Sequence, residues 1–347
     1  MKIVEVEKFG SSVSRMGFGR SITVASSSTE PKIGDVIAVR ALSESVTYGS
    51  LELPSGRLAK IVTGDVLLGV LGKRRALKGF VGEVPETVTA GDRLHLLNMG
   101  GVIGVCKGHH SSFSNAIEVE VVGLACDVEG RIINIGDGSL TPATQLLPTA
   151  PIVMIAGTCM NSGKTVAATE IIKQAANAGL RVAGAKLSGI ACLRDTLHMQ
   201  DNGAFVTASF LDCGLPSTVD HDDLASVAKS ILNHLNSSEP ELIVVELGDG
   251  IVGGYSVDEV LKDEEIKDAI SSFVFCASDY VGVIGGAAVL NGLGIEINVV
   301  AGSVTDSQMG EDYITQHFGL PAGNARRNGP RLFELVNAKV KEVAATT

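Results

Sequence analysis

A glycine-rich loop between an apolar strand and an amphipathic helix constrains this chain of 347 residues more than any other feature. Residues 157–165 have the sequence Gly-Thr-Cys-Met-Asn-Ser-Gly-Lys-Thr and directly follow the apolar run 152–156. Apolar side chains then recur with helical spacing from about 163 to 177, and Gly179 ends the pattern. A strand, a glycine loop and a helix N-terminus together point backbone N–H groups at one place and favour an anion there. The motif predicts a phosphate-binding loop.

The last two residues of this motif have distinct predicted roles. Lys164 would bring its ammonium to the terminal phosphates as a catalytic group, and Thr165 would place its hydroxyl on Mg²⁺. We therefore predict that a nucleoside triphosphate binds here with magnesium. A structural glycine turn without a ligand is the alternative. The residues predicted to contact the nucleotide are Gly157, Thr158, Cys159, Met160, Asn161, Ser162, Gly163, Lys164, Thr165 and Val166.

The rest of the sequence divides into two domains around a linker. Residues 1–140 contain short β-branched runs separated by Gly, Asp, Pro and Ser turns, which predicts an all-β barrel or sandwich. Residues 141–151 contain three prolines and no periodic pattern, which is typical of a linker. In residues 152–347, unbroken apolar strands alternate with helical patterns. This predicts an α/β domain with a mostly parallel sheet covered by helices.

Five residues separate the first glycine of the loop from Gly-Lys, one more than in the usual phosphate-loop pattern. The chain resembles the dethiobiotin synthetase group of P-loop proteins over about residues 150–305. The resemblance rests on this spacing, on a following strand that ends in Lys186 and on a later strand that ends in Glu246. The resemblance implies ATP, a metal held partly by Glu246, a second catalytic lysine at Lys186 and a homodimer. Two positions differ, because Cys159 stands where the group has Asp and Gly302-Ser303 where it has an adenine-contacting Asn.

Several polar residues near the expected carboxyl edge of the sheet are candidate ligands. Glu246 follows four apolar residues, so we expect Mg²⁺ ligation there rather than a paired surface acid. The resemblance implies that Lys186 stabilises the charge of the transferred phosphate, with a solvated strand-end lysine as the alternative. In segment 189–203, which we call the acceptor-side segment, Asp195 or Asp201 would complete the metal shell. An ordinary helix cap or surface charge explains each of them equally well.

Composition excludes several classes of protein. The net charge is −11 and there is no Lys/Arg-rich run, so a nucleic-acid partner is not expected. No apolar run reaches the length needed to span a bilayer, and the beginning of the chain has no signal segment, so we expect no membrane association. Six widely spaced cysteines predict free thiols and a cytoplasmic location.

Two classes of function fit these features. The first is an ATP-dependent ligase or kinase of the dethiobiotin synthetase type, which hydrolyses ATP or transfers its γ-phosphoryl group to a small-molecule acceptor near Lys186. The second is a nucleotide-dependent switch or accessory protein that acts on a protein partner. A β domain that presents a substrate to the nucleotide site is a third possibility. The sequence leans toward an enzyme but leaves the acceptor, the base and the role of residues 1–140 open.

Overall fold

The computed structural model describes residues 1–25 and 30–346, and the chain divides into two compact units. The β unit comprises residues 1–140, 190–194 and 210–219, and the α/β unit comprises 141–189, 195–209 and 220–347. Residues 141–151, all of them described, contain no helix or strand. The chain therefore passes from the α/β unit into the β unit and back at two places beyond the expected linker.

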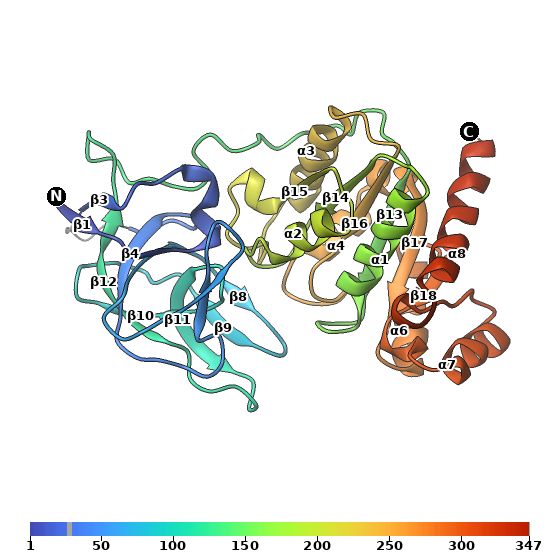
Figure 1. Cartoon of the computed structure of the whole chain (residues 1–347), viewed down its shortest axis with the longest axis horizontal. Helices are drawn as coiled ribbons and strands as arrows, with labels where there is room; N and C mark the ends of the chain where they lie inside the picture. The colour runs from blue at the N-terminus through green and yellow to red at the C-terminus, as the bar shows by residue number, and fades with distance from the viewer. Residues whose placement is uncertain (26–29, 347) are drawn as a thin grey trace. The chain divides into compact units, whose positions relative to one another are not determined.

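Five strands of the β unit close into a barrel, because each pairs with the next and the last pairs with the first (Figure 1). Around the ring they are β4 (Val36–Ala41), β7 (Val66–Leu71), β11 (Val102–His109), β10 (Arg93–Leu96) and β12 (Glu118–Ala125). The β7–β11 pair is parallel and the other four are antiparallel. Closure leaves no open edge within the ring. The expected all-β domain is confirmed, in the barrel form.

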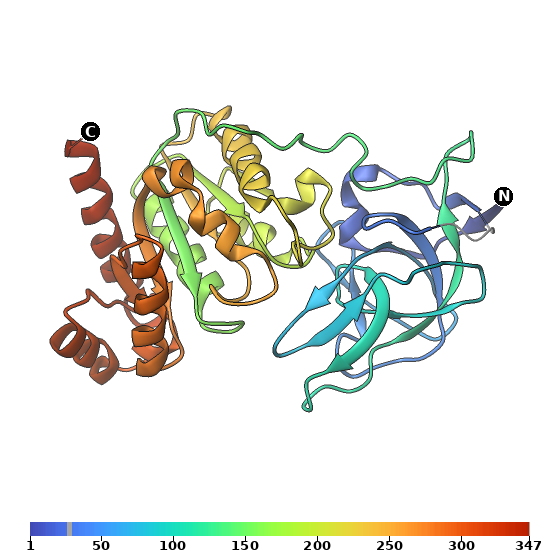
Figure 2. The same ribbon diagram turned by 180° about the vertical axis from the view of Figure 1, so that it is seen from behind.

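Shorter elements surround this ring, and Figure 2 shows the same unit from behind. Alternate residues of the ring strands form its core, including Val39, Leu67, Ile103 and Val119. The remaining strands are β1 (Lys2–Glu5), β2 (Lys8–Phe9), β3 (Ser21–Ala25), β5 (Ser50–Glu52), β6 (Leu58–Lys60), β8 (Arg74–Arg75) and β9 (Phe80–Glu83), with a 3₁₀ helix at Ser11–Met16.

The β unit also includes two segments from much later in the chain. The Asn98 side-chain amide donates to the carbonyl oxygen of Ala191 at 2.7 Å, and the Leu193 N–H donates to the Glu52 carboxylate at 2.7 Å. Glu52 is only 1% exposed and also accepts from the Ser11 hydroxyl. Ala191 N–H donates to the carbonyl oxygen of Pro216, which joins the two late segments. Buried polar groups of the β unit thus find partners in residues 190–194.

The α/β unit is built on a six-stranded sheet in which every pair is parallel. Its strand order is β15 (Val206–Ser209), β14 (Val182–Lys186), β16 (Leu242–Glu246), β13 (Ile152–Gly157), β17 (Ile270–Cys276) and β18 (Val299–Ala301). The helices are α1 (Lys164–Asn177), α2 (Arg194–Asp201), α3 (Leu224–Asn236), α4 (Val257–Lys262), α5 (Glu264–Ala269), α6 (Tyr280–Gly292), α7 (Gln308–Tyr313) and α8 (Ala325–Thr346), with short helical turns at Phe210–Cys213, Ser303–Thr305 and Ile314–Phe318. The expected parallel α/β fold is confirmed.

Helices pack on both faces of this sheet. On one face, α1 and α8 bury apolar side chains such as Ile171 and Leu332 against Val153 and Val244. On the other face, α6 lies so close that a Cβ on Gly286 would come within 2.1 Å of the Phe275 ring. The residues described include no helix of sufficient length and apolar character to cross a membrane.

Candidate functional site

The phosphate loop joins β13 to α1 and is held by the strand ends beside it. The Thr158 N–H donates to the carbonyl oxygen of Cys276 at 3.0 Å, and the Ser303 N–H donates to that of Ser162 at 3.3 Å. Asn161 and Gly163 have left-handed backbones, with φ of 63° and 102°. Gly163 is the residue before α1 and supplies no side-chain cap, so the first N–H groups of the helix remain available to an anion.

Lys164 folds its side chain back over this loop. Its ammonium donates to the carbonyl oxygen of Cys159 at 2.7 Å and lies 3.5 Å from the Ser162 hydroxyl. The side chain is buried, with 5% of the residue exposed. Gly157, at the end of β13, lies against the carbonyl oxygen of Cys276, and a Cβ there would come within 2.5 Å of that atom. Met160 lies within the loop and Val166 in the first turn of α1.

A second group of polar side chains meets at the ends of β14 and β16. The Glu246 carboxylate accepts from the Thr165 hydroxyl at 2.7 Å and from the Lys186 ammonium at 2.8 Å, all through its Oε1. Lys186 also pairs with Asp195 at 2.9 Å. We call Lys186, Asp195 and Glu246 the acid–lysine cluster. Lys186 and Glu246 are neighbours because they are partners in the parallel β14–β16 register.

The electrostatics of the two lysines differ. Burial lowers the pKa of Lys164, and the positive charge of Lys186 lowers it further. Burial also opposes the charge of Lys186, but the carboxylates of Asp195 and Glu246 outweigh it and raise the pKa of that lysine. Lys186 is thus compensated within the protein. Lys164 is a buried cation whose charge would be better stabilised by an added anion such as a polyphosphate.

Thr165 and Glu246 fit a magnesium ion. The other carboxylate oxygen of Glu246, Oε2, is buried and has no hydrogen-bond partner. An orphaned buried carboxylate oxygen beside a hydroxyl suits Mg²⁺, which takes few protein ligands and completes its shell with phosphate oxygens and water. No group of three or more His, Cys, Asp or Glu suitable for a metal occurs in the described residues. A divalent ion here would complete its shell with water or with oxygens of the nucleotide.

The two aspartates predicted as further metal ligands lie in different places. Asp195 is in the first turn of α2 and belongs to the acid–lysine cluster. Asp201 is the last residue of the same helix, and six residues at about 1.5 Å each place its backbone roughly 9 Å away along the axis. Asp201 is exposed and has no contact with the cluster in the part of the chain that is described. The structure brings together Thr165, Lys186, Asp195 and Glu246, but not Asp201.

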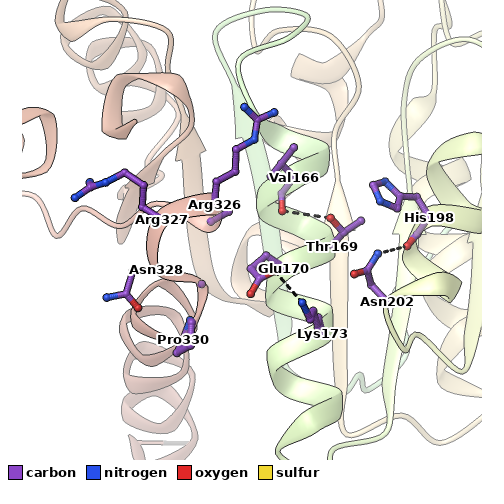
Figure 3. A pocket seen from close by; sticks show the side chains of 12 residues that line it. Val166, Thr169, Glu170, Lys173, His198, Asn202, Arg326, Arg327, Asn328 and Pro330 are labelled. Atoms are coloured by element: carbon purple, nitrogen blue, oxygen red, sulfur yellow. Dashed lines mark hydrogen bonds and ion pairs between the residues drawn. The ribbon is translucent and has the colours of Figure 1, made fainter. Parts of the chain in front are cut away.

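Two cavities lie near the beginning of α1, and sequence analysis missed both. The smaller has a volume of about 60 Å³ and includes Asn161, Gly163, Gly302, Ser303, Asp306 and Asn324. The larger, of about 580 Å³, lies among α1, α2 and the beginning of α8 (Figure 3). Val166, Ala325 and Arg326 line both. Residues near 322 reach this place through a parallel bridge between Val300 and Ala322, which no local motif predicts.

Comparisons with known proteins give only remote likenesses. A scan against protein-family models and a search of curated proteins found no match. Among solved structures, the chain is similar to chloroplast FtsY from Physcomitrella patens, with 14% identity, a TM-score of 0.38, and coverage of 57% of this chain and 70% of that one. A DUF1611 family protein from Anabaena variabilis has 12% identity, a TM-score of 0.42, and coverage of 57% and 63%. The 54 kDa signal recognition particle protein from Aeropyrum pernix K1, in complex with GDP, has 16% identity, a TM-score of 0.38, and coverage of 61% and 53%.

These TM-scores are all below 0.5, so the likenesses support no argument about function. What the chain's own geometry establishes is a P-loop architecture: a central parallel strand, a glycine loop with a buried lysine, and a helix that begins at that lysine.

Proposed function

We propose that the α/β unit binds and hydrolyses a Mg²⁺-bound nucleoside triphosphate and works as a switch, whose output is a change in the β unit. The main support is the position of the acid–lysine cluster in the chain. Lys186 and Asp195 belong to the α/β unit and form an ion pair, whereas residues 190–194 between them belong to the β unit. If the distance between Lys186 and Asp195 changes, the chain moves on both sides of residues 190–194. These residues belong to the β unit, so the movement would be passed to that unit.

Binding would use the phosphate loop and the cluster in different ways. The loop N–H groups and the Lys164 ammonium would hold the phosphates, and Thr165 and Glu246 would hold Mg²⁺, which when bound neutralises phosphate charge. Glu246 now accepts from Lys186 through Oε1. If Glu246 bound Mg²⁺ instead, Lys186 would keep Asp195 as its ion-pair partner, and its ammonium would become available to a phosphate oxygen. Charge stabilisation of this kind is most of phosphoryl-transfer catalysis.

The segment between Lys186 and Asp195 has specific partners in the β unit. Ala191 accepts from Asn98, and Leu193 donates to the buried Glu52 carboxylate. A buried carboxylate that loses such a donor costs about 1–3 kcal/mol, so the segment cannot move without a response from Glu52. This supports a switch more than a simple enzyme.

Phosphoryl transfer to a small-molecule acceptor, as in the dethiobiotin synthetase likeness, is the second candidate. His198 of α2 and Asn202, the residue after this helix, line the 580 Å³ cavity, a volume suited to a metabolite. Lys186 does not line it. The geometry therefore supports the acceptor hypothesis less well than the switch, and the narrower likeness stays a prediction.

Hydrogen exchange of the full chain tests the switch. We expect residues 52–53 and 190–194 to exchange at different rates with Mg²⁺ and a non-hydrolysable triphosphate than with the diphosphate, and Lys164→Ala to abolish the difference. Equal exchange in both states would exclude the switch. Phosphate release with and without a panel of metabolites tests the second candidate, because an acceptor must speed turnover and become phosphorylated.

We also propose a homodimer in the cytoplasm. All six cysteines are free thiols, which suits a reducing compartment. Residues 280–295 contain no charged side chain, and α6 exposes Val281 (77%) and Ile284 (55%). Two copies that each carry a net charge of −11 repel least over an uncharged face, so we place a second copy of this chain there. Sedimentation should show a dimer that Ile284→Glu dissociates; a monomeric wild-type chain would exclude it.

A further inference from the structure

We propose that residues lining the 60 Å³ cavity beside the phosphate loop contact the base of the nucleotide and select guanine over adenine. The proposal rests on the proposed nucleotide function and adds the chemical class of the ligand. It also departs from ATP, which the dethiobiotin synthetase likeness implies. The groups that line the cavity support this selectivity, above all Asp306, together with Arg326.

The cavity continues directly from the phosphate site. Asn161 and Gly163 belong to the phosphate loop and also line the cavity. A Cβ on Gly163 would lie 2.9 Å from the Cα of Gly302, and a Cβ on Gly302 would lie 2.2 Å from the carbonyl oxygen of Ser162. Two glycines thus let the loop after β18 approach the phosphate loop closely. A nucleotide with its phosphates at α1 would have its nucleoside end here.

Asp306 is held in position by a buried asparagine. Asn324 is 3% exposed, and its side-chain nitrogen donates to Asp306 Oδ1 at 2.9 Å and to the Thr305 hydroxyl at 3.0 Å. Its side-chain oxygen accepts from the N–H groups of Arg326 and Arg327. All four hydrogen-bonding positions of this amide are therefore used within the protein. Asn324 is a positioning residue, and the exposed Asp306 is left to meet the ligand through its other oxygen, Oδ2.

Arg326 supplies donors on the same cavity. Its side chain is exposed and has no ion-pair partner among the residues described, whereas the neighbouring Arg327 pairs with Glu311 at 2.9 Å. Figure 3 shows Arg326 extending alongside Val166 at the phosphate-loop end of α1, while Arg327 points away. The cavity therefore offers an acceptor-only carboxylate and a donor-only guanidinium.

This pair of groups matches guanine. The ring N1–H and the 2-amino group of guanine are adjacent donors that suit the Asp306 carboxylate, and its O6 and N7 are the acceptors that Arg most often contacts. Adenine has an unprotonated N1 where the carboxylate needs a donor, and an amino group where the guanidinium needs an acceptor. With adenine bound, the Asp306 carboxylate and the Arg326 guanidinium would lack hydrogen-bond partners, which would weaken the binding of an adenine nucleotide strongly.

Titration of the full chain with fluorescent GDP and ADP analogues tests the inference without turnover. We expect GDP to bind at least ten-fold more tightly than ADP, and Asp306→Ala to remove most of that difference. Asp306→Asn should gain affinity for xanthosine diphosphate, whose 2-oxo group accepts from the introduced amide. Asp312→Asn, an exposed acid on the adjacent α7, is the matched control and should leave the preference unchanged.

The outcomes separate this inference from the proposed function. Equal affinity for both diphosphates, with both lost in Lys164→Ala, would overturn guanine selection and leave the nucleotide site intact. Tighter binding of ADP would overturn it in the same way. Failure of both diphosphates to bind would overturn the proposed function together with the inference. A gain of xanthosine diphosphate binding in Asp306→Asn cannot come from misfolding and would support direct contact with the base.

Discussion

The phosphate loop and the acid–lysine cluster lie side by side at one edge of the sheet, but they are built in opposite ways. The loop is a run of consecutive residues whose shape is set by two left-handed positions and by its contacts with adjacent strand ends. The cluster is assembled from the ends of β14 and β16 and the beginning of α2. The loop has a buried lysine that lacks a matched anion, whereas the lysine of the cluster is already paired with two carboxylates. Binding should therefore depend on the loop, and the response to binding on the cluster.

Glu246→Gln should have the largest effect on turnover of the variants considered. The amide keeps an acceptor for Thr165 and Lys186 but removes the charge that suits Mg²⁺. We expect the rate of phosphate release to fall by roughly 10²–10³, as when a group that stabilises transition-state charge is lost. Diphosphate affinity measured without Mg²⁺ should change by less than about three-fold. A variant with wild-type turnover would remove Glu246 from the catalytic site.

Lys164→Ala should affect the loop alone. Loss of a buried charge-assisted contact to phosphate, worth about 2–3 kcal/mol, should weaken triphosphate binding by about 100-fold in calorimetry. The matched control is Lys341→Ala, an exposed lysine on α8, which should bind as the wild type does. Retention of wild-type affinity by Lys164→Ala would contradict the phosphate-loop assignment.

Lys186→Met should destabilise the cluster without nucleotide, because it leaves the Glu246 and Asp195 carboxylates uncompensated. Loss of one partner of a buried pair costs about 3–5 kcal/mol, so the thermal midpoint should fall by several degrees. Added Mg²⁺ should restore part of the loss in this variant, since a divalent ion replaces the missing positive charge. Thermal unfolding with and without Mg²⁺ measures both effects, and no response to Mg²⁺ would argue against a cation at Glu246.

Asp195→Asn should have the smallest effect on the rate of phosphate release. It tests whether the cluster carries the response to the bound nucleotide. Lys186 keeps Glu246, so turnover should change by less than about ten-fold. The difference in hydrogen exchange of residues 190–194 between nucleotide states should decrease, because the ion pair that ends this segment is gone. An unchanged difference would show that Asp195 does not link the nucleotide to the segment.

The sequence predicts best those features that depend on residues close together in the chain. The phosphate loop, the α1 helix at Lys164–Asn177 and the parallel strands follow from short-range pattern and spacing. Glu246 lies beside the end of β14, a position that follows from the four apolar residues before it and from parallel strands ending at one edge. The β domain was predicted only as barrel or sandwich, since closure depends on the β10–β12 and β7–β11 pairings between distant strands.

What the sequence does not predict depends on contacts across long separations. The pair of Asp306 with Asn324 forms because residues 320–324 return to β18, and a single isolated polar residue gives no signal of that. Asp195 and Asp201 looked equivalent as ligands, but the helix that joins them puts them at opposite ends. The sequence does not predict that residues 190–194 belong to the β unit, because a short, mainly apolar segment of five residues suits any loop.

The Glu52 carboxylate has a practical consequence for anyone who wishes to produce the barrel by itself. A fragment that stops at residue 140 retains Glu52 and Asn98 but lacks Leu193 and Ala191, the backbone groups that satisfy them. Such a truncation would leave the buried Glu52 carboxylate and the Asn98 amide each short of one hydrogen-bond partner, which should lower the stability of the barrel. A working excision would have to graft residues 190–194 and 210–219 onto the barrel, so the boundary between the units is not a single point along the chain.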